Sequence, residues 1–211
     1  MENNIVPVLP DDRFRFDCSN EVPCFNACCR DLNQFLTPYD ILRLKNHLGL
    51  TSGTFLEKYT LQHIGPETGL PVVTLKPISD ADLQCPFVTP DGCRVYANRP
   101  SSCRIYPVAR AISRSRETGR ITEHFALIKE PHCLGFQRDK SQTVSEWMRS
   151  QEVTAYNELN DMFIEIISLK NRLMPGPLAL RAQHLFHTAL YDIDAFRTQI
   201  SQNDLVLSLI H

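Results

Sequence analysis

Apolar residues recur at helical spacing in the segment 37–49, and both ends of this segment carry helix-boundary signals. Thr37 is a good N-cap, and Asp40, three positions later, completes a capping box. Gly49 supplies a stop just after the last apolar position. The pattern therefore predicts the first clear helix of the chain over 37–49.

Further segments repeat the helical period. We predict a short helix over 51–62, a long helix from Thr143 or Ser145 to about Leu173, and one or two more over 178–190 and 193–209. We expect Trp147, Tyr156 and Phe163 to lie in a core. The apolar residues that keep helical spacing in the long helix are Tyr156, Leu159, Phe163, Ile166, Ile167 and Leu173.

Strand patterns occupy shorter stretches. Residues 72–77 are predicted to form a strand, and residues 104–130 a hairpin, because polar and apolar positions roughly alternate on both arms. The hairpin turn falls at 117–120, where Gly119 meets the need for a positive φ. Residues 1–17 contain two prolines and are expected to form an extended lead-in.

The composition is that of an ordinary globular chain, with 43 % hydrophobic and 22 % charged residues among 211. A net charge of -2 gives the protein as a whole no electrostatic reason to bind nucleic acid or a membrane surface. No window approaches the ~20 apolar residues of a membrane helix, and the first residues lack a secretory-signal pattern. We therefore expect a cytoplasmic protein whose thiols stay reduced.

Eight cysteines are the strongest chemical signal in the chain, and they are clustered. Disulfides are disfavoured, because the chain is much longer than small disulfide-stapled domains and lacks an export signal. Metal ligation is the favoured interpretation. The predicted ligands are Cys18, Cys24, Cys28, Cys29, Cys85, Cys93, Cys103 and Cys133.

Thiolates are soft ligands that select zinc, cuprous copper or iron–sulfur clusters. Eight of them could fill two four-coordinate sites, or one site with thiols to spare. The neighbours Cys28 and Cys29 need not bind the same ion, and either could be a free nucleophile, although nothing marks a catalytic partner for it. The C-x₂-C knuckles of a zinc ribbon are missing from the sequence.

A metal centre with ligands from distant parts of the chain would fasten the fold together. The sequence therefore predicts an α+β fold, mainly helical, in which a small metal-stapled irregular domain with an antiparallel hairpin covers 15–140. Residues 141–211 are expected to form a helical C-terminal extension packed on it. The apolar faces of these helices leave open whether they pack within the chain or between chains.

Arginines surround the second cysteine cluster. Arg94, Arg99 and Arg104 flank Cys93 and Cys103, and could offset the negative charge of a thiolate centre or donate hydrogen bonds to sulfur. The alternative is that they simply pair with surface acids.

Two further features concern the same stretch. Pro100 can start a short helix over 101–104, whose free N–H groups would lower the pKa of Cys103.

Seven arginines and one glutamate occupy 94–120, which could form a basic patch for an anionic partner. We favour a solvated hairpin whose arginines balance thiolates and nearby acids.

Histidines are weaker candidates for the site. His124 and His132 lie near the last cysteine and could bind a metal or a sulfur, but a structural role is the commoner one. His184 and His187 lie one helical turn apart and are expected at the surface.

Four motifs together are similar to a known family. They are the first cluster from Cys18 to Cys29, the segment Cys85-Pro-Phe87, the run from Cys93 to Pro107, and Pro131-His-Cys-Leu-Gly135. The string Cys-x-x-Tyr-x-x-Arg-Pro-x-x-Cys-Arg-x-x-Pro is the most specific part. From Cys18 to about Trp147 the chain resembles the CxxCxxCC family, the YkgJ-like cysteine-cluster proteins described as zinc- or iron-chelating domains.

All eight cysteines fall on family positions, with one departure in spacing. The leading motif of the family is usually C-x-x-C-x-x-C-C, and here it is stretched to C-x₅-C-x₃-C-C. The insertions lengthen the loops between ligands without removing a ligand.

The resemblance implies a metal-chelating cysteine-cluster protein that binds an iron–sulfur cluster, of the [4Fe–4S] type, or Zn²⁺. A flagellin lysine N-methylase that resembles the same family gives a precedent for a redox or protein-modifying role. The alternative is a zinc-stapled module without catalytic activity, which binds a protein partner through the C-terminal helices or the arginine-rich hairpin. No catalytic motif decides whether the chain is an enzyme.

Overall fold

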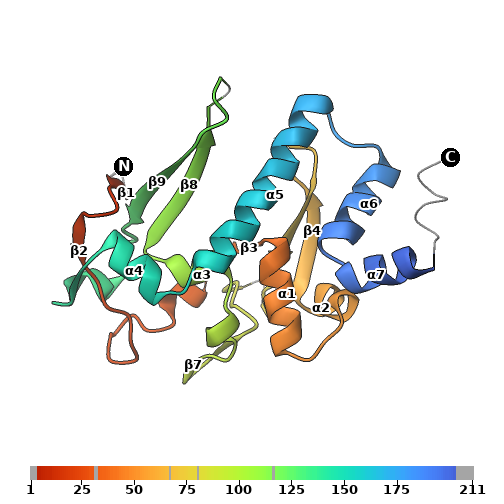
Figure 1. The fold of residues 1–211 in the computed structure, drawn as a ribbon. Coiled ribbons are helices and arrows are strands. Elements are labelled where there is room, and N and C mark those ends of the chain that lie inside the picture. The colour runs from red at the N-terminus through yellow and green to blue at the C-terminus, as the bar shows by residue number, and fades with distance from the viewer. Residues whose placement is uncertain (1–3, 31–32, 67, 80, 116, 203–211) are drawn as a thin grey trace.

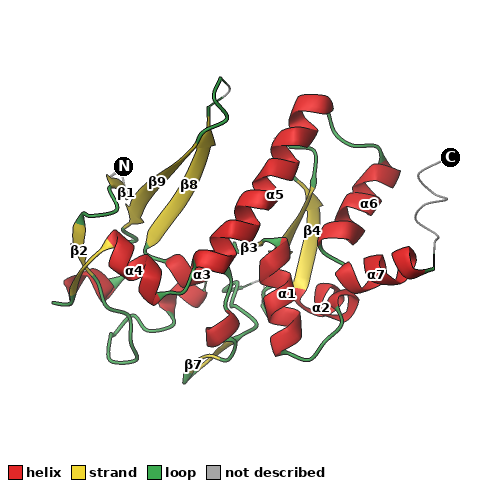
Figure 2. Cartoon of the chain, viewed as in Figure 1, coloured by secondary structure: helices red, strands yellow, loops and turns green. Residues whose placement is uncertain are grey.

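The computed structural model describes residues 4–30, 33–66, 68–79, 81–115 and 117–202. Over these residues the chain forms seven α-helices and four small antiparallel sheets (Figure 1, Figure 2), which confirms the predicted α+β class. In these same ranges no helix combines the length and the apolar character needed to cross a bilayer.

The helices and strands have the following bounds. The α-helices are α1 (Pro38–His47), α2 (Ser52–Tyr59), α3 (Ser101–Ile105), α4 (Val144–Ser150), α5 (Thr154–Leu173), α6 (Leu180–Leu190) and α7 (Ile193–Ser201). Short 3₁₀ helices are η1 (Ala27–Cys29), η2 (Tyr96–Asn98) and η3 (Leu134–Gln137). The strands are β1 (Ile5–Val8), β2 (Arg13–Arg15), β3 (Phe35–Leu36), β4 (Thr60–Ile64), β5 (Pro71–Leu75), β6 (Val88–Thr89), β7 (Gly92–Cys93), β8 (Val108–Arg114), β9 (Ile121–Ile128) and β10 (Ser141–Thr143).

The predicted hairpin is present as β8 and β9, and its turn has Gly119 at φ +70°. It is shorter than expected at its start, because Arg104 and Ile105 belong to α3. The N-terminal lead-in contributes to two sheets: β1 adds a third strand beside β9, and β2 pairs with β10. These elements enclose the hairpin core, which consists of Phe14, Phe16, Ile105, Val108, Leu127, Val144, Trp147 and Val153.

A second core lies under α1 and α2, against the sheet β3-β5-β4. Thr37 and Asp40 form the predicted capping box at the start of α1, and Gly49 after its end has φ +65°. Every second residue of β5 is buried, as a strand with one covered face requires. This sheet core consists of Leu36, Ile41, Leu44, Phe55, Val73, Leu75, Cys85, Phe87, Val95 and Tyr191.

Two predicted helices differ from the structure. The helix expected over 51–62 ends at Tyr59, because Thr60–Ile64 pairs along β5 as strand β4. The long helix is broken into α4 and α5, with Glu152 at φ +52° between them. Trp147 and Val153 both enter the hairpin core. They are six positions apart, so an unbroken helix would point them in different directions, and the break lets both face inward.

Only part of the apolar face of α5 is buried. Tyr156 is 3 % exposed, and Phe163 packs against Phe186 and Tyr191. Of the other residues with the same period, Leu159, Ile166 and Leu173 are exposed and Ile167 is half-buried. Tyr156 and Trp147 therefore lie in cores as predicted, whereas most of the helical stripe faces outward.

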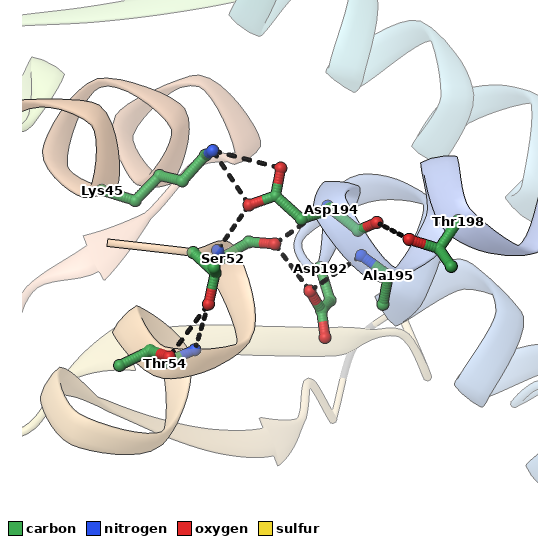
Figure 3. Close-up of polar contacts among 8 residues, drawn as sticks. Lys45, Ser52, Thr54, Asp192, Asp194, Ala195 and Thr198 are labelled. Carbon is green, nitrogen blue, oxygen red and sulfur yellow. Dashed lines mark hydrogen bonds and ion pairs between the residues drawn. The ribbon is translucent and has the colours of Figure 1, made fainter. Parts of the chain in front are cut away.

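Helix α7 is attached to the N-terminal helices by a polar network rather than by an apolar face (Figure 3). The Asp194 carboxylate accepts hydrogen bonds from Lys45 Nζ at 2.9 Å and from the Ser52 backbone N–H at 2.8 Å. The Ser52 hydroxyl donates to Asp192 Oδ1 at 2.6 Å. Because α2 and α7 both begin here, the two carboxylates also complement the positive ends of two helix dipoles.

Replacing this carboxylate tests the attachment of α7. We expect Asp194→Asn to lower the free energy of unfolding by about 1–2 kcal/mol, because Lys45 and the Ser52 N–H lose a charged acceptor that is only partly exposed. The exposed Arg15–Asp139 pair, with N–O distance 3.8 Å, supplies the control Asp139→Asn, for which we expect an unchanged urea midpoint. Equal losses in the two variants would contradict this account.

The same carboxylate predicts a pH dependence. Backbone hydrogen bonding from Ser52, followed by the Lys45 contact, lowers the pKa of Asp194 below its ordinary 3.8. Its contribution is therefore present above pH 3.8 and is lost as the pH falls through the lower, folded-state pKa. Urea titrations between pH 6 and pH 3 should show wild type losing more stability than Asp194→Asn over that interval.

Candidate metal centre

Three cysteines gather where β2 leads into the first cysteine loop. The backbone N–H of Leu134 donates to Cys24 Sγ at 3.2 Å, which places Cys24 beside Cys133. The Asp17 N–H bonds to Gly135 O at 3.1 Å and holds Cys18 against the same segment. We call Cys18, Cys24 and Cys133 the first thiol group.

Four other cysteines approach one another from separate segments. The Cys85 N–H donates to Cys29 O at 2.9 Å, which joins the loop before β6 to η1. The third cysteine, Cys93, lies near Cys85 because Cys93 pairs with Val88 across strands β7 and β6. Cys103, in α3, is close enough to Cys85 and Cys93 to interact electrostatically with both. The second thiol group is Cys29, Cys85, Cys93 and Cys103.

Cys28 lies between these groups. It acts electrostatically on Cys18 and Cys133 on one side and on Cys85, Cys93 and Cys103 on the other. Its sulfur accepts a hydrogen bond from the neighbouring Cys29 thiol, which lowers the pKa of Cys28 and raises that of Cys29. Cys28 is thus within electrostatic reach of both groups, and Cys29 belongs to the second.

Each thiol group abuts a different core. Cys85 belongs to the sheet core, and Cys29 and Cys93 pack on it. Cys133 packs on the hairpin core. The cysteine loops therefore occupy the junction of the two halves of the fold.

The thiol pKa values indicate that a bound cation would stabilise the thiolate forms. Burial raises the pKa of Cys18 to about 11, with Cys28, Cys133 and Cys24 adding to the shift. Cys103 keeps an exposed edge, yet desolvation by the protein around its sulfur raises its pKa to about 12, with Cys85 and Cys28 next in effect. The lower pKa predicted for Cys103 from the start of the short helix is therefore wrong, because desolvation outweighs the effect of the helix N–H groups. Neighbouring thiolates repel one another, and a bound cation would relieve this repulsion. A donor set of this chemistry fits a thiophilic metal.

Backbone N–H groups already point at three of the sulfurs. Burial dominates the raised pKa values of Cys85, Cys93 and Cys133, and the backbone N–H two residues later in the chain, that of Phe87, Val95 or Gly135, acts to lower each pKa. Such N–H groups stabilise the thiolate form. Three of the predicted ligands thus have a nearby N–H group that favours the thiolate form.

A comparison with protein families matches residues 17–134 to the family CxxCxxCC, described as "Putative zinc- or iron-chelating domain". The matched stretch is more than half of the chain and contains all eight cysteines. The chain belongs to the CxxCxxCC family. A search of curated proteins and a search of solved structures each returned no match.

All eight family cysteines are free thiols in the structure, with Cys85 buried and the others partly or largely accessible. Among the described residues, no three His, Cys, Asp or Glu side chains already converge on a point that could hold an ion. Ligation by these thiols would thus require their side chains to move from the positions they have here.

The arginines next to the family cysteines differ in what they contact. Arg99 and Arg94 lower the pKa of Cys93, against the larger effect of burial. Arg104 is directed elsewhere: it donates to Gln151 O at 2.8 Å and Ala97 O at 2.5 Å, and lies 5.0 Å from the Tyr156 ring centroid. The predicted charge compensation is thus supported for Arg94 and Arg99, whereas Arg104 joins α3 to η2 and the α4–α5 link.

Two arginines of the β8–β9 hairpin pair with acids. Arg110 forms a bidentate pair with Asp161, with both N–O distances 2.7 Å, and a third contact to Glu123 at 2.6 Å. Arg114 pairs with Glu165. This supports the interpretation of 94–120 as a hairpin whose arginines balance nearby acids.

The histidine candidates contact other groups. His124 Nε2 lies 2.8 Å from Ser113 Oγ across the hairpin, and His132 Nε2 lies 3.5 Å from Glu130 Oε2. His184 is exposed, and His187 is half-buried beside Tyr191. None of these four rings is hydrogen-bonded to a sulfur in the part of the chain that the structure describes.

Two residues near the thiols were not singled out from the sequence. The Tyr106 hydroxyl is buried without a partner at full hydrogen-bond geometry, but it is close enough to Cys133 to lower the pKa of that thiol. Gln34 Oε1 lies 3.3 Å from Cys103 Sγ. Tyr106 stands inside the Cys-Arg-Ile-Tyr-Pro motif, so its position was a usable signal, whereas Gln34 has no motif to mark it.

Proposed function

We propose that the protein binds iron–sulfur clusters through its eight cysteines, in two centres at the junction of the two cores. The first thiol group, completed by Cys28, would hold one centre, and the second thiol group the other. The observation that carries the proposal is the approach of thiols from separated segments into two sets. Each set then supplies four soft ligands, the number that a [4Fe–4S] cluster takes.

Groups around the sulfurs favour a redox role. The N–H donors from Phe87, Val95 and Gly135, with Arg94 and Arg99, would offset negative charge on a thiolate-bound centre and so raise its reduction potential. The protein would then transfer electrons or form part of a protein-modifying enzyme. We place it in the cytoplasm, where free thiols persist.

The second candidate is a zinc-stapled interaction module. Four thiolates also satisfy tetrahedral zinc, and the position of the thiols between two cores suits a purely structural ion. Such a module would have no catalytic activity and would bind a protein partner.

Anaerobic purification of the full chain discriminates the candidates. We expect a brown protein with broad absorbance near ~400 nm, acid-labile sulfide, and iron in excess of one atom per chain. A colourless protein with stoichiometric zinc and no sulfide would establish the module instead. A protein that acquires neither metal, under anaerobic conditions with reduced thiols, would refute both.

A further inference from the structure

Helix α5 carries an exposed apolar stripe that its own chain leaves uncovered in the described ranges. The helix has 20 residues, so it is about 30 Å long. It runs between the β8–β9 hairpin and α6 (Figure 1), held by the Arg110–Asp161 pair on one side and the Phe163–Phe186 contact on the other. The stripe residues and their exposed fractions are Leu159 40 %, Met162 61 %, Ile166 42 %, Leu169 46 % and Leu173 66 %.

The spacing of these five residues is 3, 4, 3 and 4, which is the a/d pattern of a heptad repeat over two heptads. Their side chains form one continuous seam along the helix. Apolar patches of this extent on a monomer mark interaction sites, since scattered single residues would need no explanation. A seam of a/d residues is complementary in shape to another helix with the same pattern.

We infer that the α5 stripe pairs with the α5 stripe of a second copy of this chain, in an antiparallel arrangement about a two-fold axis. Charge on one edge of the stripe selects this occupant. Glu158 and Arg172 are both exposed at equivalent heptad positions, two heptads apart. In the described residues neither side chain has an ion-pair or hydrogen-bond partner.

Glu158 and Arg172 cannot meet within one helix, because 14 residues separate them by about 21 Å. An antiparallel pair places the Glu158 end of one copy against the Arg172 end of the other, and symmetry repeats the contact. Glu165 has the equivalent position at the centre of the same edge, and its charge is already paired with Arg114. The edge is thus self-complementary in the antiparallel orientation, whereas a parallel pair would put the two copies of this edge on opposite sides of the seam, where Glu158 and Arg172 could not meet.

The oligomeric state of the full, metal-loaded chain tests the inference. Sedimentation equilibrium should show a dimer for wild type, and Ile166→Asp should raise its dissociation constant about 100-fold or more. Ile164→Asp is the matched control: Ile164 is 39 % exposed on the same helix but off the stripe, so its dimer should persist. Because both positions are exposed in the single chain, both variants should keep the wild-type far-ultraviolet circular dichroism spectrum, whereas the melting temperature of Ile166→Asp alone should fall as dimer is lost.

A charge exchange tests the orientation. Arg172→Glu should weaken the dimer about 3- to 10-fold, and adding Glu158→Arg in the same chain should restore it. A monomeric wild type, equal dissociation by Ile164→Asp and Ile166→Asp, or a dimer insensitive to Ile166→Asp would each overturn the inference. In those cases the stripe does not pair with a second α5.

Discussion

Replacing Cys85 with serine is expected to remove about half of the bound metal and to lower the free energy of unfolding by about 4 kcal/mol or more. Cys85 belongs to the sheet core and to the second thiol group only. Loss of a structural metal ligand is one of the few single changes with so large an effect. Cys133→Ser should remove the other half, because Cys133 packs on the hairpin core with the first thiol group.

The measurement is metal content per chain, followed by urea unfolding of each variant. The double variant Cys85→Ser with Cys133→Ser should be metal-free, and complete chelation of wild type should reproduce its unfolding curve. Ser19→Ala, next to Cys18, is the control, since it alters a side chain beside the cluster without altering a sulfur. If either single variant lost all of its metal, the thiols would form one centre rather than two. A wild type that kept its melting curve without metal would end the claim that metal holds the fold together.

Replacing Asp40 with alanine is expected to lower the free energy of unfolding by about 3 kcal/mol. Asp40 is 0 % exposed and accepts bonds from the backbone N–H groups of Thr37 at 2.9 Å and Ser101 at 2.8 Å. The first bond caps α1, and the second serves the start of α3, the helix that carries Cys103. One buried carboxylate thus joins the sheet-core helix to a predicted metal ligand.

Metal content separates this role from simple capping. Asp40→Ala should also lower the metal occupancy of the second thiol group, because α3 loses the contact that sets the position of Cys103. Glu146 completes an equivalent capping box at α4, but that box is exposed and serves one helix only. Glu146→Ala should therefore cost much less stability and leave the metal content unchanged. Equal behaviour of the two variants would show that Asp40 is an ordinary cap.

Local signals predicted much of the secondary structure. The Thr37 capping box, the stop at Gly49 and the turn at Gly119 were all confirmed, because each depends on residues within a few positions of one another. The short helix started by Pro100 was confirmed as α3, for the same reason. The predicted boundary between a metal-binding domain that ends at 140 and a helical extension that begins at 141 stays a prediction.

The errors came from contacts between distant residues. Nothing near Thr60 marks the end of a helix, but strand β5 pairs with Thr60–Ile64. The break between α4 and α5 follows from the hairpin core, which takes both Trp147 and Val153. The lead-in was expected to be merely extended, because its strand partners β9 and β10 lie more than a hundred residues away.

For the candidate site, the sequence by itself determined the chemistry: eight thiols, their clustering, and membership of the CxxCxxCC family follow from residue types and spacing. Only the tertiary structure decided which thiols are neighbours, that Cys28 lies within reach of both thiol groups, and that Arg104 donates to backbone carbonyls. It also decided which side of α5 faces outward. The reason is physical: ligand type is a property of single residues, whereas proximity and exposure are set by how two separate cores pack around the loops between them.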